Sequence, residues 1–202
     1  MQNVLPRRIR RFVYIRTSKV MNVGELDTER RWYVMRDLKR SNALLPAYKQ
    51  LKEAGMEVFT PMVSRLFTRN GKRIQREVPV IQDLLFVNDC RRNIDTIVAK
   101  TPTLQYRFKK GGTFGEALVV PDDEMNKFIA ATQATDTPKF YSAEEVSSLM
   151  CGRNVRVVGG VLNGYEGKLQ TVRGSKKKHL VIMLPSLVAV SVEIEDEFIE
   201  LL

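Results

Sequence analysis

The chain contains very little cysteine and histidine: Cys90, Cys151 and His179 are all that it has in 202 residues. A structural zinc site needs four such ligands at short spacing, so the sequence predicts no metal site. The same scarcity excludes a disulfide framework, and we expect both thiols to be reduced. No nucleophile stands beside a general base, and Lys110–Gly115 lacks the Gly-Lys-Ser/Thr order of a phosphate-binding loop. We therefore expect no enzymatic activity and no cofactor.

Long hydrophobic runs are also missing. No apolar stretch approaches the roughly 18 residues that a membrane-spanning helix needs. The stretch Phe12–Ile15 is too short for the core of a signal peptide, and Arg16 ends it. We therefore expect a cytoplasmic, monomeric protein without a membrane partner. Because 44% of the residues are hydrophobic, the chain still has enough apolar side chains for buried cores.

Positive charge is what the chain has in excess, with a formal net charge of +10. Residues 1–31 hold 8 basic and 3 acidic side chains, and residues 32–134 hold 17 and 11, whereas residues 152–202 hold 7 and 6. The excess therefore lies in the first two thirds of the chain. Such a surface attracts polyanions through counterion release, although a basic surface that serves only solubility explains the charge equally well.

The last fifty residues have the pattern of a small all-β module. Apolar strands are predicted at Val155–Val158, around Leu169 and Val172, and at Leu180–Leu184, Leu187–Ile194 and Phe198–Leu202. Glycines recur between the first two strands, where tight corners demand a positive φ. Five short strands in so short a span predict a β-barrel over residues 152–202, and any small SH3-like barrel would show the same pattern.

The preceding part of the chain has the pattern of an α+β domain over residues 31–132. The predicted order is β-α-β-hairpin-β-α-β-α, which gives a mixed or antiparallel sheet flanked by helices. We expect residues 1–30 to be a flexible basic tail. Residues 133–151 are expected to be a polar linker, in which Ser142 and Glu145 can form a helix-capping box. A polar linker predicts a barrel that is tethered to the first domain and not packed against it, the alternative being that the helix starting at Ser142 and Glu145 clamps the barrel in place.

Residues 62–80 are predicted to form a hairpin that projects into solvent. Asn70-Gly71 is the residue pair typical of a type I′ turn. Basic and apolar residues share the same parity on the strands, so neither face is dry enough to pack in a sheet. We predict that its basic side chains contact nucleic acid through phosphates, the alternative being a turn charged only for solubility. These side chains are Arg65, Arg69, Lys72, Arg73 and Arg76.

Four segments of the first domain resemble the NusG family of transcription elongation factors. They are Trp32-Tyr33-Val34, then Pro61-Met62 with Gly71-Lys72-Arg73 around the hairpin, then Pro79 followed by Leu85-Phe86-Val87, and Gln105-Tyr106-Arg107-Phe108 before a glycine loop. The C-terminal module resembles a KOW motif, the RNA- and protein-binding barrel of ribosomal proteins and NusG-type factors. Together the two resemblances cover residues 31–202.

The resemblance implies a bacterial factor that binds RNA polymerase, closes its cleft, and suppresses pausing or termination. Two departures from the family favour a specialised RfaH-type or UpxY-type paralogue. Gln82-Asp83-Leu84 stands where the family usually has Pro-Gly-Tyr, and Thr96 alone remains of a threonine-rich polymerase contact.

The resemblance also implies an apolar patch that docks on the clamp helices of the largest polymerase subunit. Carried over to this sequence, the patch consists of Tyr33, Ile81, Leu84, Phe86 and Tyr106. We expect at least two of these side chains to be exposed, although strand alternation also fits residues of a core.

Further partners are implied for the hairpin and for the barrel. The hairpin would contact nascent RNA or non-template DNA. The barrel would contact RNA, a ribosomal protein or a termination factor, unless its basic residues are only a charged loop tip. These residues are Arg173, Lys176, Lys177 and Lys178. A ribosome-associated KOW-type RNA-binding protein is the alternative function, and the Trp-Tyr strand with its basic hairpin argues against it.

Overall fold

The computed structural model describes residues 28–38, 45–135, 138–142, 145, 152–160, 162–171, 178–194 and 199–202. Most of the predicted tail lies outside these residues, as does most of the helix expected after the capping box. The capping box itself is present and confirms its prediction. The Ser142 N–H donates to Glu145 Oε2 at 2.7 Å, and the Glu145 N–H donates to Ser142 Oγ at 3.4 Å.

An antiparallel sheet forms the centre of the first domain, with strand order β2-β5-β1-β6 and with β7 also paired to β1. Its strands are β1 Arg30–Asp37, β2 Glu57–Phe59, β5 Leu85–Cys90, β6 Leu104–Tyr106 and β7 Val119–Val120. Because successive side chains point to opposite faces, Trp32 and Phe86 enter one buried cluster while Tyr33 and Val87 enter another. Both faces of this sheet are therefore covered.

Within the described residues, three helices cover the two faces of the sheet. Helices α2 Ala47–Glu53 and α3 Arg91–Lys100 pack on the face that contains Tyr33, and α4 Asp122–Gln133 packs on the face that contains Trp32. Helix α2 begins only after Pro46, which is the N-cap. A proline fits the beginning of a helix because it lacks an N–H and clashes with a preceding turn. The α+β class predicted for this domain is confirmed.

The C-terminal part is a six-stranded antiparallel sheet in the order β13-β9-β10-β11-β12-β8. All five predicted strands are present, as β9 Asn154–Val157, β10 Glu166–Thr171, β11 Lys178–Leu184, β12 Val188–Ile194 and β13 Ile199–Leu201. The sixth strand, β8 Lys139–Ser142, comes from the segment predicted to be a plain linker and pairs with β12. That interpretation is corrected for these residues, because Phe140 packs against the buried core.

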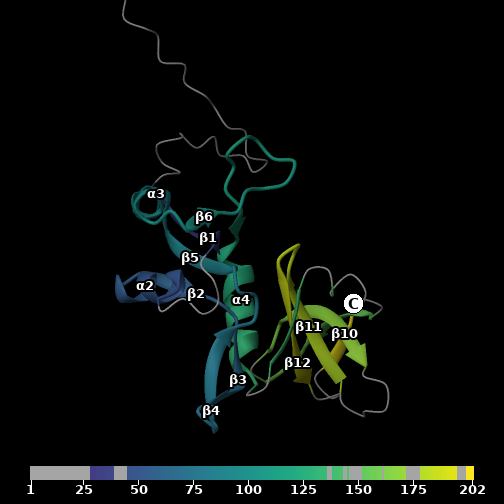
Figure 1. The fold of residues 1–202 in the computed structure, drawn as a ribbon. Coiled ribbons are helices and arrows are strands. Elements are labelled where there is room, and N and C mark those ends of the chain that lie inside the picture. Colours follow the sequence, from purple (N-terminus) through teal and green to yellow (C-terminus); the bar gives the residue numbers. More distant parts are fainter. Residues whose placement is uncertain are drawn as a thin grey trace, which may run out of the picture.

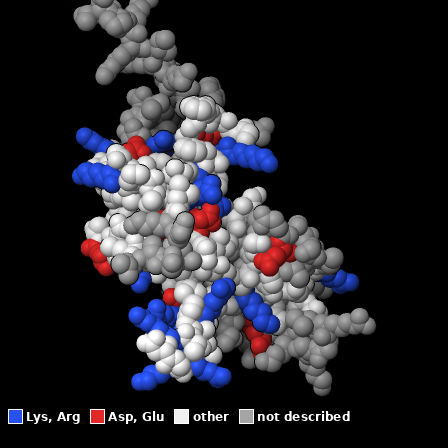
Figure 2. Space-filling view, viewed as in Figure 1, with Lys and Arg blue, Asp and Glu red and all other residues white. Residues whose placement is uncertain are grey.

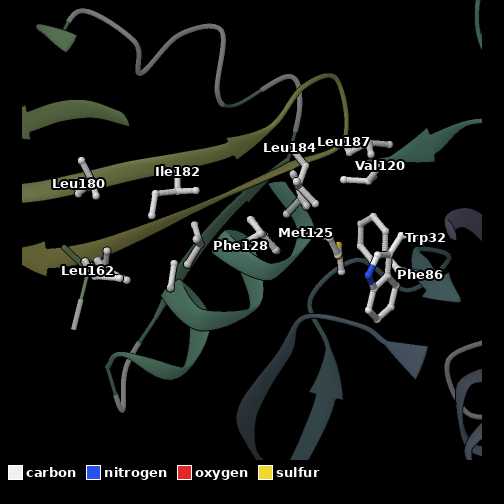
Figure 3. Close-up of a cluster of buried hydrophobic side chains, with 14 of the residues drawn as sticks. Trp32, Phe86, Val120, Met125, Phe128, Leu162, Leu180, Ile182, Leu184 and Leu187 are labelled. Carbon is white, nitrogen blue, oxygen red and sulfur yellow. The ribbon is translucent and has the colours of Figure 1, made fainter. Parts of the chain in front are cut away.

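The two sheets share one hydrophobic core, which they form around α4. Figure 1 shows α4 between the first domain and strands β11 and β12. Figure 3 shows Leu184 and Leu187 beside Val120 and Met125, with Trp32 and Phe86 just beyond. The expectation of a tethered barrel is therefore not met: the C-terminal sheet is packed against the first domain, because α4 has apolar side chains for both.

Replacing Phe128 should test this shared core. Phe128 is 0% exposed, and its ring lies 6.2 Å from that of Phe59. We expect Phe128→Ala to lower the free energy of unfolding by about 3–5 kcal/mol, as deletion of a buried aromatic ring usually does. Urea unfolding measures the loss, and Lys127→Ala, an exposed neighbour on the same helix, is the control. A loss no larger than that of the control would show that α4 is not central to the core.

Candidate nucleic-acid interface and apolar patch

The predicted hairpin is an independent two-stranded element. Strands β3 Met62–Arg69 and β4 Lys72–Pro79 pair with each other and with no other strand among the described residues. They extend away from the rest of the first domain (Figure 1). At the turn, Asn70 has φ 51° and Gly71 has φ 73°, and a type I′ turn requires positive φ at both positions. The predicted turn and the projecting hairpin are thus confirmed.

The two faces of the hairpin differ in chemistry. The pairing puts Arg65 opposite Arg76, Phe67 opposite Ile74, and Arg69 opposite Lys72. Because cross-strand partners point the same way and faces alternate along a strand, these three pairs lie on one face. We name it the Phe67 face; it consists of Val63, Arg65, Phe67, Arg69, Lys72, Ile74, Arg76 and Val78. The opposite face, the Leu66 face, consists of Ser64, Leu66, Thr68, Arg73, Gln75 and Glu77.

Positive charge is concentrated on the Phe67 face, which carries all the hairpin cations except Arg73 and no acid. None of the five hairpin cations takes part in an ion pair within the described part of the chain. Figure 2 shows Lys and Arg side chains gathered at the end of the molecule where Figure 1 places β3 and β4. Like charges directly opposite each other destabilise a strand pair, so this arrangement costs stability until a polyanion neutralises it.

The five residues of the predicted polymerase patch do not form one surface. Tyr33 and Tyr106 lie on the face that α2 and α3 cover, with ring centroids 5.8 Å apart. Leu84 and Phe86 lie on the face that α4 covers, and Ile81 is half-buried beside them.

The expectation that at least two patch residues are exposed is wrong for this structure, since Tyr33, Leu84, Phe86 and Tyr106 are all buried. Central strands with helices on both sides bury both parities, so an apolar run in such a strand does not indicate a docking surface.

Tyr106 is held in place by its polar partners as well as by burial. Its hydroxyl donates to Asp95 Oδ1 at 2.8 Å, and the Arg91 guanidinium lies 5.5 Å from its ring centroid. Burial, followed by the bond to Asp95, raises the pKa of the Tyr106 phenol far above its usual value. In this structure Tyr106 therefore fixes α3 on the sheet and is not presented to a partner.

Asp83 joins two parts of the first domain. Its carboxylate lies 3.2 Å from Arg36 Nε and 3.2 Å from Arg107 of the segment after β6. Exposed ion pairs are individually weak, so the chief effect is to position the loop that carries Leu84.

The sequence interpretation gave no role to exposed aromatic residues. Phe67 is 42% exposed, and Phe114 is fully exposed on the loop between Lys109 and Glu116. That loop is closed by the Thr113 N–H, which donates to Glu116 Oε2 at 3.0 Å and holds the pKa of that carboxyl below its usual value. The sequence could have placed Phe67 on the cationic face of the hairpin. An Asn-Gly turn fixes the register of the two strands, and the register determines which face each side chain occupies.

The remaining predicted site lies mostly outside the described residues. This holds for Arg173, Lys176 and Lys177, whereas Lys178 begins β11 opposite Thr171 and is half-buried. Among the described residues, no group of three side chains is arranged to hold a metal ion, and no helix is long and apolar enough to cross a membrane.

In a comparison with known protein families, residues 30–129 match the family described as "Transcription termination factor nusG". No curated protein matches the chain. The match covers all elements from β1 into α4, including the hairpin.

Because the patch is buried, a charged substitution within it should destabilise the fold. Exposed contact residues would tolerate Asp, but Phe86 is 0% exposed, and an unpaired carboxylate there would lose its hydration. We expect Phe86→Asp to prevent stable folding, as measured by circular dichroism and thermal melting. Phe114→Asp places the same charge on an exposed aromatic position and should leave the melting curve unchanged. If the Phe86→Asp protein folds normally, Phe86 is a surface residue and its assignment to the core is wrong.

Proposed function

We propose that this protein is a transcription elongation and antitermination factor, because residues 30–129 match the family model of the transcription factor NusG. NusG family factors are not enzymes, in agreement with the expectation from the sequence. A NusG N-terminal domain implies binding to RNA polymerase. We propose that this binding keeps the polymerase clamp closed and thereby suppresses pausing or termination.

The observation that carries the proposal is the hairpin. It projects from the polymerase-binding domain with five cations that have no ion-pair partner among the described residues. If the protein binds polymerase beside the nucleic acid of an elongation complex, the hairpin lies close to many backbone phosphates. We propose that Arg65, Arg69, Lys72, Arg73 and Arg76 contact nascent RNA or non-template DNA there. This contact adds electrostatic affinity and needs no particular sequence.

The proposed polymerase contact involves Ile81, Leu84 and Phe86 and the clamp helices of the largest subunit. These residues lie on the α4 side of the sheet, within the core that the C-terminal sheet helps to bury. Binding through this side therefore requires the C-terminal sheet to separate from α4, and contact with Phe86, which α4 itself covers, also requires α4 to shift. A partner drives such a change only as far as it binds the open state more tightly than the closed one. Tyr33 and Tyr106, on the opposite face, support the patch from behind.

The departures at Gln82-Asp83-Leu84 and Thr96 support a specialised paralogue of the RfaH or UpxY type. The C-terminal sheet, as a KOW module, would then bring a ribosomal protein, a termination factor or RNA to the complex through Arg173 and Lys176–Lys178. The alternative of a ribosome-associated protein has less support, because the family match falls on the first domain, the part that separates the two classes.

Pull-down of the full chain from a bacterial lysate, with and without nuclease, separates these two functions. Recovery of RNA polymerase that resists nuclease supports an elongation factor, and recovery of ribosomes overturns it. Purified polymerase stalled at a pause site then provides the activity test. Addition of the protein should shorten the pause, and an unchanged or longer pause would contradict antitermination.

Removal of the hairpin charge should weaken binding to the elongation complex without affecting the fold. Replacing Arg69, Lys72 and Arg73 with Ala should change the free energy of unfolding by no more than about 0.5 kcal/mol, as exposed substitutions usually do. Affinity should fall more at low salt than at high salt, because phosphate contacts release counterions. Replacing the exposed Lys49, Lys52 and Lys100 of α2 and α3 removes the same charge elsewhere and serves as the control. Equal losses at both salt concentrations would remove nucleic acid from the proposal.

A further inference from the structure

The Phe67 face combines an exposed aromatic ring with a frame of cations. Phe67 lies between Arg65 and Arg69 along β3, and its cross-strand partner Ile74 lies between Lys72 and Arg76 along β4. Side chains two residues apart on a strand are separated by roughly 6.8 Å, so the four cationic side chains flank the ring on the same face. The centre of the face is thus apolar and its surroundings are positive.

The Leu66 face provides an internal comparison. Leu66 is 70% exposed, more than Phe67 at 42%, yet its surroundings are close to neutral, since Arg73 and Glu77 are the charged residues of that face. Gln75 Nε2 donates to Ser64 Oγ at 2.7 Å, which ties two polar groups of this face together. Charge and aromatic surface therefore coincide on one side of the hairpin only.

Neither feature of the Phe67 face stabilises the hairpin by itself. Arg65 opposite Arg76 and Arg69 opposite Lys72 are like-charge pairs, which destabilise a strand pair. An exposed phenylalanine adds unfavourable apolar contact with water. A ligand that is anionic at its edges and flat and apolar at its centre relieves both costs. Unpaired nucleotides have these properties, because each presents a base face beside a phosphate.

We propose that the Phe67 face binds single-stranded nucleic acid, and this inference rests on the hairpin contact of the proposed function. An unpaired base stacks on Phe67, and the flanking phosphates are held by Arg65, Arg69, Lys72 and Arg76. In a duplex the base faces are already stacked on each other, so only the edges of the bases in the grooves are accessible to the Phe67 ring. The proposal therefore predicts a preference for a single strand over a duplex of equal length.

Binding of the full chain to a labelled DNA strand of about 12 nucleotides, a length within the usual range for one single-strand site, tests the proposal. We expect Phe67→Ala to weaken this binding by about 5- to 150-fold, the range that corresponds to loss of one base–aromatic stack. Leu66→Ala, the matched control from the other face, should weaken it less than about twofold, since surface changes away from a site have small effects. The duplex of the same sequence should bind Phe67→Ala and the unsubstituted chain equally.

A spectroscopic variant keeps the test independent of any change in stability. Trp32 is the only tryptophan and is buried, so Phe67→Trp introduces a second tryptophan that is exposed. Addition of the single strand should quench its emission, whereas the emission of Leu66→Trp should not change. A strand of equal length with abasic sites throughout keeps the phosphates and should give no quenching.

The pattern of losses separates this proposal from the proposed function. A charge variant, Arg69→Ala with Lys72→Ala, should reduce the salt dependence of single-strand binding by about 0.7 in log–log slope per lost contact. If the charge variant weakens binding but Phe67→Ala does not, the hairpin binds phosphates alone, which overturns stacking and leaves the proposed function standing. If Phe67→Ala weakens duplex binding equally, the single-strand preference is wrong. If neither variant changes binding to any strand, the nucleic-acid role of the hairpin fails as well, and the polymerase pull-down alone then decides the elongation function.

Discussion

The central constraint in this protein is that one helix packs in a core shared by two sheets. Helix α4 places Phe128 against Phe59 at 6.2 Å between ring centroids, and Phe59 in turn lies 6.2 Å from Phe86 on the central strand. The same buried cluster continues into Ile182 and Leu184 of the C-terminal sheet. A shift of α4 would therefore disturb the packing of both sheets. For this reason the position of the C-terminal sheet and the accessibility of the α4 side of the first domain are physically linked.

The hairpin obeys a different constraint. It has no strand partner outside itself among the described residues, and its cationic face remains exposed while the C-terminal sheet is packed. Electrostatic attraction acts over distance and mainly raises the rate of association. The hairpin can thus bring the closed protein to a polyanion before any apolar patch is uncovered. Close apolar docking would follow once the sheet has separated from α4.

Local rules were enough to predict much of this fold from the sequence. Asn70-Gly71 specified the turn, and Ser142 with Glu145 specified a capping box, because both depend on neighbouring residues alone. Exposure could not be predicted in the same way, since it depends on which helices cover a sheet. The runs Trp32–Met35 and Leu84–Val87 are apolar at every position, and such runs are typical of strands buried on both faces. The pairing of Lys139–Ser142 with β12 depends on distant residues and had no local signal.

The same burial sets the condition for an opening of the molecule. Separation of the sheets would expose Met125 and Val120 on one side and Leu184 and Leu187 on the other, all of them apolar and nearly or fully buried. Exposure of apolar surface costs free energy in proportion to its area, so the closed form is favoured until a partner covers that surface. Nucleic acid on the hairpin cannot provide this cover, because the hairpin does not belong to the shared core. Only a partner with an apolar surface of its own can do so. The two proposed contacts are therefore complementary: the hairpin raises the rate of encounter, and apolar docking on polymerase provides the free energy for opening.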